Sequence, residues 1–275
     1  MAHAFLGEDA AQAAIEVFSS RVVFLTLFIV AFIAWTLQRQ LEESAEFTAQ
    51  KSSEKSSSIV DNIKLLFTNK IAVKTVAFLA VIYLTWNLVA SVMGFFMPHI
   101  YETAGGLSNE TANMLSCVSW VFVVVTTFII SFFVDKVAHR FFYIFGLAAA
   151  LTAWILIIGG GVSTIGGIWL FTILWGVNNG SSVQVFYALW GSELFPAKFR
   201  AGAQGLMFFI VRGLSAVWGL VFTFIYGDNG EGFTLAAYCM ITLLLISLVV
   251  GLVGMPNTRG KSLEQITKER YGENI

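Results

Sequence analysis

One apolar stretch, from Phe141 to Val162, decides the fold of this sequence: it reads FFYIFGLAAALTAWILIIGGGV and holds no charged residue. A helix needs about 20 apolar residues to cross the hydrocarbon core of a bilayer. Inside that core the backbone must satisfy its own hydrogen bonds, so a spanning segment of this kind is helical. Working outward, we expect seven transmembrane helices in an all-α integral membrane protein: Val22–Leu37 (the shortest), Thr75–Met97, Met114–Val134, Phe141–Val162, Gly167–Trp190, Ala203–Tyr226 and Phe233–Met255.

The composition of the 275 residues agrees, since 57% are hydrophobic and 12% are charged, against about 25% charged residues in a soluble domain. A net charge of −1 gives no reason to expect a nucleic-acid partner. Cys117 and Cys239 both stand in apolar runs and predict neither a disulfide framework nor a metal site. The sequence shows no phosphate-binding glycine loop and no nucleophile with a base, so we expect no cofactor and no enzyme activity.

The basic residues predict the orientation in the membrane. All but two of the 16 Lys and Arg residues, Arg21 and Arg212, fall in loops or tails on one side of the expected spans. Cytoplasmic loops carry the excess of Lys and Arg, so this side and the C-terminus are expected to be cytoplasmic. Residues 1–20 have no basic region and no cleavage-site pattern, so we expect no signal peptide. Short outer loops favour a multi-pass protein of a bacterial inner (plasma) membrane.

The spacing of the spans predicts four segments. Residues 1–37 form an outer tail and a first helix, and residues 38–74 form a polar cytoplasmic loop rich in Ser and charge. Within that loop, residues 59–67 have the pattern of a short amphipathic helix. Residues 75–255 hold six closely linked helices, and residues 256–275 form a cytoplasmic tail. A polar loop between helix groups is how two transporter halves are joined, so the first helix is expected to be the last helix of a missing half. The three prolines, Pro98, Pro196 and Pro256, are expected to mark span ends.

Three stretches resemble motifs of one family. Residues 135–140 (DKVAHR) look like the Asp-Arg-x-Gly-Arg-Arg loop of the major facilitator superfamily. Residues 192–201 (SELFPAKFRA) look like the sugar-porter motif Ser-Glu-x-Phe-Pro-x-x-x-Arg-Ala. Residues 256–264 (PNTRGKSLE) look like its tail motif Pro-Glu-Thr-Lys-Gly-x-Ser-Leu-Glu. All three follow expected spans on the same side, so the chain is identified as similar to the C-terminal half of a sugar-porter-like member, plus the preceding helix.

The charged motif residues predict a conformational clamp. Asp135 and Glu193 can pair with Arg140 and Arg200 between neighbouring helix ends, and Arg can do so through two parallel hydrogen bonds. Such ion pairs hold one conformation of a rocking transporter and are released in the other. The alternative is ordinary charge that flanks membrane helices and sets their topology.

Polar residues inside spans are the candidates for solute contact, because polar groups facing lipid are costly. The fifth span carries Asn178, Asn179, Gln184 and Tyr187, whose amides and hydroxyl suit a neutral polyhydroxyl compound. The alternative is that these side chains only bond to neighbouring helices.

The second span carries Trp86, Asn87 and Ser91 and resembles the family's seventh helix. At the positions of the usual hexose-binding amide pair it has Thr85 and Trp86, which argues against a typical glucose or xylose site. The Trp86 indole is expected either to stack on a sugar or polyol ring or to pack in the core.

Arg212 stands near the middle of the sixth span and cannot lose its charge there. The seven spans offer no Asp or Glu to pair with it. Three roles are open: contact with a carboxylate of an acidic substrate, pairing with a residue of the missing half, or bonding to helix carbonyls in a structural role.

The resemblance implies transport of a sugar, polyol or related organic solute by alternating access, with proton coupling in the full-length protein. A single half is expected to be inactive alone. The expected partners are the small-molecule solute, membrane lipid, and the missing N-terminal half or another copy of the chain. Two alternatives are a non-transporting membrane interaction partner and a transporter of an organic acid anion that uses Arg212.

Overall fold

The computed structural model describes residues 2–39, 64, 66–134 and 136–272, in two units, Met1–Ser56 and Ser57–Ile275. Asp135 and most of the expected amphipathic segment 59–67 lie outside the described residues. The first unit contains one long helix, α1 (Ala2–Gln38), which includes an apolar window from Arg21 to Gln38. At its end, the Arg39 guanidinium lies 4.2 Å from the centroid of the Trp35 ring, a favourable cation–π arrangement.

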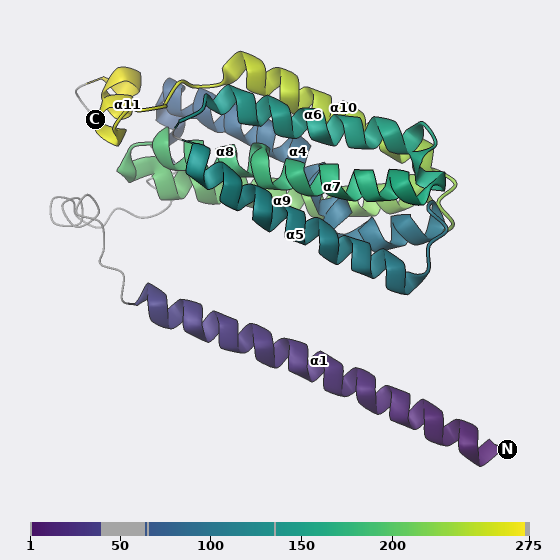
Figure 1. Cartoon of the computed structure of the whole chain (residues 1–275). Helices are drawn as coiled ribbons and strands as arrows, with labels where there is room; N and C mark the ends of the chain where they lie inside the picture. Colours follow the sequence, from purple (N-terminus) through teal and green to yellow (C-terminus); the bar gives the residue numbers. More distant parts are fainter. Residues whose placement is uncertain (1, 40–63, 65, 135, 273–275) are drawn as a thin grey trace. The chain divides into compact units, whose positions relative to one another are not determined.

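The second unit is a bundle of helices, and every regular element in its described part is helical. Figure 1 shows these helices side by side, with α11 at one end of the bundle. They are α4 (Lys70–Thr103), α5 (Asn109–Phe133), α6 (His139–Ile158), the 3-10 turn η1 (Gly161–Ser163), α7 (Ile165–Ser181), α8 (Val183–Glu193), α9 (Ala197–Tyr226), α10 (Phe233–Gly254) and α11 (Leu263–Tyr271). The expected all-α membrane fold is therefore confirmed.

Polar side chains fix where several of these helices begin. The side-chain oxygen of Asn69 accepts from two backbone amides at the start of α4, and Ser108 and Thr164 cap α5 and α7 in the same manner. Ser262 and Gln265 form a reciprocal capping box at the start of α11. These caps satisfy helix N–H groups that have no partner within the helix.

Two details differ from the sequence prediction. Pro98 does not end a helix but lies inside α4, which continues to Thr103. The fifth expected span is not one helix, because α7 and α8 meet at Ser182, whose backbone (φ −114°, ψ −131°) is not helical. Six helices of the described residues are long and apolar enough to cross a membrane by themselves. The helices α7 and α8, with 17 and 11 residues, are not among these six, so a seventh crossing at the fifth expected span stays a prediction.

Glycines allow α5 and α7 to pack closely. A Cβ atom placed on Gly176 would lie 2.7 Å from the carbonyl oxygen of Ser119, and one on Gly180 would lie 2.6 Å from that of Val123. Small residues four positions apart let helix backbones approach in this way. The packing of α7 on α5 therefore depends on the absence of side chains at both positions.

The C-terminal helix α11 is attached to the bundle by named contacts. Ile266 is buried, Arg270 donates from Nη2 to Thr75 Oγ1 at 2.7 Å, and the Tyr271 hydroxyl donates to the carbonyl oxygen of Leu194 at 3.1 Å. Burial raises the pKa of the Tyr271 phenol, so it remains protonated and able to donate at neutral pH. The start of α4 and the end of α8 are thus joined through α11. We call this end of the bundle, where α6 begins and α10 ends, the tail end.

Candidate functional site

Aromatic and polar side chains from α4, α8 and α9 converge inside the bundle. The Tyr83 and Tyr187 rings stack with centroids 3.8 Å apart and planes 6° from parallel. The Tyr83 hydroxyl interacts with the side chains of Gln184 and Arg212. The Arg212 guanidinium also lies 4.9 Å from the centroid of the Phe208 ring. Gln184 and Tyr187 of the fifth expected span and Arg212 of the sixth therefore all contact Tyr83.

A buried hydrogen bond lies on the same two helices, α4 and α9. The Ser215 hydroxyl donates to Asn87 Oδ1 at 3.0 Å, and both side chains are buried. Trp86 is 3% exposed, its ring centroid is 6.2 Å from that of Tyr83, and its Nε1 has no hydrogen-bond partner among the described residues. A buried indole N–H usually finds a partner. Trp86 thus keeps an unused donor next to the aromatic pair.

A pocket of about 480 Å³ lies between α4 and α9. Its polar lining comes from Ser91, Arg212 and Ser215, and its apolar lining includes Phe95 and Phe96. The Ser91 hydroxyl donates to the carbonyl oxygen of Leu88 at 3.1 Å, and Arg212 is exposed within this unit. A mostly apolar concavity with a few polar groups is the usual form of a small-molecule site. The pocket can accept a ligand that presents both hydroxyl groups and an apolar face.

Asn178 and Asn179 are placed elsewhere. Asn178 is fully buried, and its Oδ1 accepts from the Ser182 hydroxyl at 2.7 Å beside the α7–α8 break. Asn179 donates from Nδ2 to the carbonyl oxygen of Trp175 at 3.0 Å and lines a separate pocket of about 30 Å³ between α4, α5 and α7. Their described hydrogen bonds are to their own span, so both solute contact and bonding to a neighbouring helix stay predictions for these two residues.

Sequence reasoning missed Tyr83 and Ser215. Both stand in apolar runs, where a single Tyr or Ser has no pattern that separates a site residue from a packing residue. The spacing of Tyr83, Trp86 and Asn87 at i, i+3 and i+4 places them on one helix face, and that was the available indication.

Three of the four predicted clamp residues, Arg140, Glu193 and Arg200, lie near helix ends in the described part of the chain. Arg140 donates from Nη2 to the carbonyl oxygen of Leu252 at 3.4 Å, and Arg200 donates from Nε to that of Phe195 at 3.4 Å. Glu193 is half-buried at the end of α8. Because Asp135 lies outside the described residues, the four-residue clamp stays a prediction.

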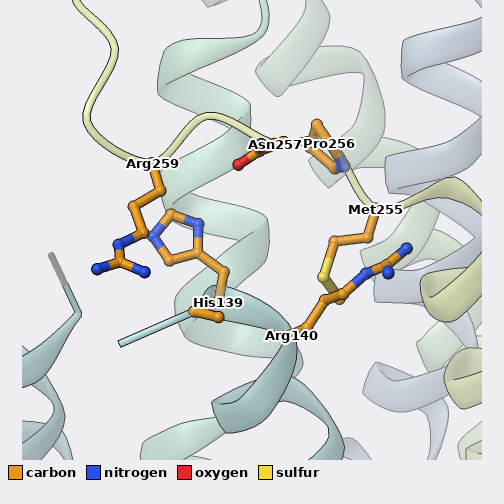
Figure 2. Close-up of a pocket in the computed structure, with 7 residues that line it drawn as sticks. His139, Arg140, Met255, Pro256, Asn257 and Arg259 are labelled. Atoms are coloured by element: carbon orange, nitrogen blue, oxygen red, sulfur yellow. The ribbon is translucent and has the colours of Figure 1, made fainter. Parts of the chain in front are cut away.

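Two of the sequence motifs meet at a second pocket at the tail end, with a volume of about 390 Å³ (Figure 2). Its lining comes from residues 138–140 of the loop motif, from Met255 at the end of α10, and from Pro256, Asn257 and Arg259 of the tail motif. Arg259 donates from Nη2 to the carbonyl oxygen of Lys136 at 2.6 Å, which joins the two segments.

Comparisons with known proteins agree with these motifs. The family model described as Major Facilitator Superfamily matches residues 10–220. The chain is also 38% identical over 202 residues to the minor myo-inositol transporter IolF of Bacillus subtilis (strain 168). That alignment covers 72% of this chain and 45% of the relative, so the chain spans about half the length of the curated relative it matches.

Proposed function

Since the chain belongs to the major facilitator superfamily, we propose that its bundle α4–α10 acts as one half of a transporter for a polyol, a sugar or a related organic solute. Transport takes place by alternating access, when this half rocks against a complementary six-helix half around a site near the membrane midplane. The likeness to a protein named as a myo-inositol transporter favours a cyclic polyol.

The observation that carries this proposal is the convergence of Tyr83, Gln184, Tyr187 and Arg212 beside the α4–α9 pocket. Gln184 and Arg212 offer N–H donors, and hydroxyl and amide oxygens offer acceptors, which matches the alternating donors and acceptors of a polyol. The aromatic faces suit the C–H side of its ring. We assign solute contact to six residues: Trp86, Asn87, Ser91, Gln184, Tyr187 and Arg212. Asn178 and Asn179 have a structural role in α7, through their hydrogen bonds within that span.

Energy coupling belongs to the complementary half in this proposal. The described residues in the middle of α4–α10 include no Asp or Glu that could carry a proton. We therefore place the proton-carrying carboxylate of a symporter on the other half. The clamp residues Asp135, Arg140, Glu193 and Arg200 control opening at the tail end.

The function is tested by uptake of radiolabelled myo-inositol into vesicles. The chain is reconstituted alone and together with a separate polypeptide of five helices, which completes the other half with α1. We expect uptake only with both halves, stimulated by an inward proton gradient. Failure of every sugar and polyol to enter, with both halves folded, would favour the non-transporting interaction partner instead.

One observation favours a second candidate, the transport of an organic acid anion. The Arg212 guanidinium lines the pocket, and its described partners are neutral groups. A carboxylate in this pocket would form a charge-assisted hydrogen bond with it. The Arg212 substitutions described in the Discussion separate the two candidates.

Topology is predicted by the charge distribution, with the tail end in the cytoplasm. In a background lacking Cys117 and Cys239, single cysteines are placed at Asn109, exposed at the start of α5, and at Glu264, exposed on α11. A membrane-impermeant maleimide added to intact cells should label position 109 and leave position 264 unlabelled until the cells are opened. The reverse pattern would invert the assigned orientation.

A further inference from the structure

We infer that the α4–α9 pocket selects its solute by hydrogen-bond polarity, and that Ser91 and Ser215 accept hydrogen bonds from two hydroxyl groups of the solute. This inference rests on the proposed function and narrows the solute to a cyclic polyol whose hydroxyl groups are free at two ring positions. A derivative in which either hydroxyl is replaced, or is substituted on its oxygen, is a poorer solute.

The hydroxyl proton of Ser91 is used within its own helix. Ser91 Oγ donates to the carbonyl oxygen of Leu88 at 3.1 Å, and a carbonyl oxygen can only accept. A serine hydroxyl has one O–H donor and two acceptor lone pairs. Because its proton is directed to Leu88, Ser91 presents lone pairs to the pocket that it lines.

The hydroxyl proton of Ser215 is directed in the same way, by a neighbouring helix. Ser215 Oγ on α9 donates to Asn87 Oδ1 on α4 at 3.0 Å. Ser215 is 8% and Asn87 4% exposed, so water competes little for this bond. Asn87 is not among the residues that line the pocket, whereas Ser215 is. Asn87 therefore holds the Ser215 proton and leaves the Ser215 lone pairs for the solute.

Arg212 supplies the opposite polarity. A guanidinium has five N–H donors and no acceptor. Arg212 and Ser215 stand at i and i+3 on α9, so they lie on one face of that helix, while Ser91 lies on α4. A solute with two O–H donors and one acceptor oxygen matches this set. A carboxylate would satisfy Arg212 alone and would leave both serines without a donor, so the lining favours a neutral polyol.

The other lining side chains cannot replace a lost hydrogen bond. They are apolar or absent: Val92, Phe95, Phe96, Ala216 and Gly219. A site built to hydrogen-bond a hydroxyl group rejects an analogue that lacks it, because polar groups are then left unpaired. We therefore expect the two serines to determine specificity and not only to line the pocket.

The test uses deoxy and deoxyfluoro derivatives of myo-inositol, one pair for each ring position. Fluorine can accept a weak hydrogen bond but cannot donate one, so it identifies the hydroxyl groups that must donate. Each derivative competes with radiolabelled myo-inositol for uptake by vesicles that contain both halves. At two ring positions the deoxy and fluoro derivatives should be weakened equally, by about 3- to 10-fold, the loss of one neutral hydrogen bond.

Three single variants assign these two positions to residues. Ser215→Ala should abolish the discrimination at one position and Ser91→Ala at the other, so that myo-inositol and the fluoro derivative compete within about twofold. Ser131→Ala is the matched control, because its hydroxyl also donates to a carbonyl three residues earlier, at 2.7 Å, and it lies on α5 outside the pocket lining. It should keep both positions. Unfolding temperatures show whether each variant is folded.

If every fluoro derivative competes as well as myo-inositol in the wild type, the inference is wrong and the proposed function still stands. This comparison needs no variant. A folded Ser215→Ala protein that keeps the wild-type pattern also overturns the inference. If unmodified myo-inositol does not enter the vesicles, the cyclic polyol of the proposed function and this inference both fail.

Discussion

Replacing Gly180 by alanine is expected to destabilise the bundle more than any other single-methyl change considered. The added Cβ would lie 2.6 Å from the carbonyl oxygen of Val123, 2.7 Å from Thr126 Cβ and 3.0 Å from the Thr127 amide nitrogen. Two of these obstacles are backbone atoms, so α5 and α7 must move apart. Overpacking of a well-packed interior costs about 1–3 kcal/mol, and we expect the upper end of that range.

The matched control is Gly205→Ala, in the middle of the first half of α9. A Cβ placed there meets nothing within 4 Å, so the same chemical change should be neutral or stabilise by about 0.5–1 kcal/mol through backbone entropy. Unfolding temperatures of both variants are measured in one detergent by intrinsic tryptophan fluorescence. Gly180→Ala should unfold at least about 5 °C below Gly205→Ala, given 2–4 °C per kcal/mol for a unit of this size. Coincident unfolding temperatures would show that α5 and α7 do not depend on this close approach.

The largest functional effect is expected for Arg212→Gln. Removing the guanidinium would take away its interaction with Tyr83 and the charge-assisted hydrogen bond proposed to the solute, worth about 1.5–3 kcal/mol. This predicts a roughly 10- to 150-fold loss of transport efficiency for myo-inositol in vesicles that contain both halves. Arg212→Lys keeps the charge but not the fork, and it should lose less. A folded Arg212→Gln protein with wild-type uptake would remove Arg212 from the site.

The same variant separates a neutral solute from an acidic one. Competition of uptake is measured with a neutral sugar and its matching sugar acid. If the wild type prefers the acid and Arg212→Gln loses that preference, the organic-anion candidate is favoured. Equal competition by both compounds in the wild type eliminates it.

The sequence predicted the spans well because lipid imposes one requirement on every residue of a crossing. Long apolar runs such as 233–255 coincide with a helix to within a residue, Phe233–Gly254. Pro98 was wrong as a boundary because a proline removes one donor but does not oblige a helix to end there. The break at Ser182 has no proline beside it and gave no local indication in the sequence.

The sequence predicted only some features of the candidate site. Polar residues in spans are rare enough to be noticed, and Asn87, Gln184, Tyr187 and Arg212 were noticed in this way. Which of them lie in one site depends on the orientation of each helix about its own axis. The pattern of residues along one helix does not determine the orientation of the neighbouring helix. Asn178 and Asn179 are adjacent in the sequence, yet one contacts Ser182 and the other lines a different pocket.

The break at Ser182 can act as a hinge at which α8 tilts relative to α7. The segment before the break is held between α5 and α6, while α8 packs chiefly on α4. With 11 residues, α8 is about 16 Å long, so a tilt of about 10° at Ser182 moves its far end about 3 Å. That far end carries the Leu194 carbonyl, which accepts the 3.1 Å bond from Tyr271. A small tilt at Ser182 would therefore displace the Leu194 carbonyl by about the length of its hydrogen bond to Tyr271, which is enough to break the attachment of α11.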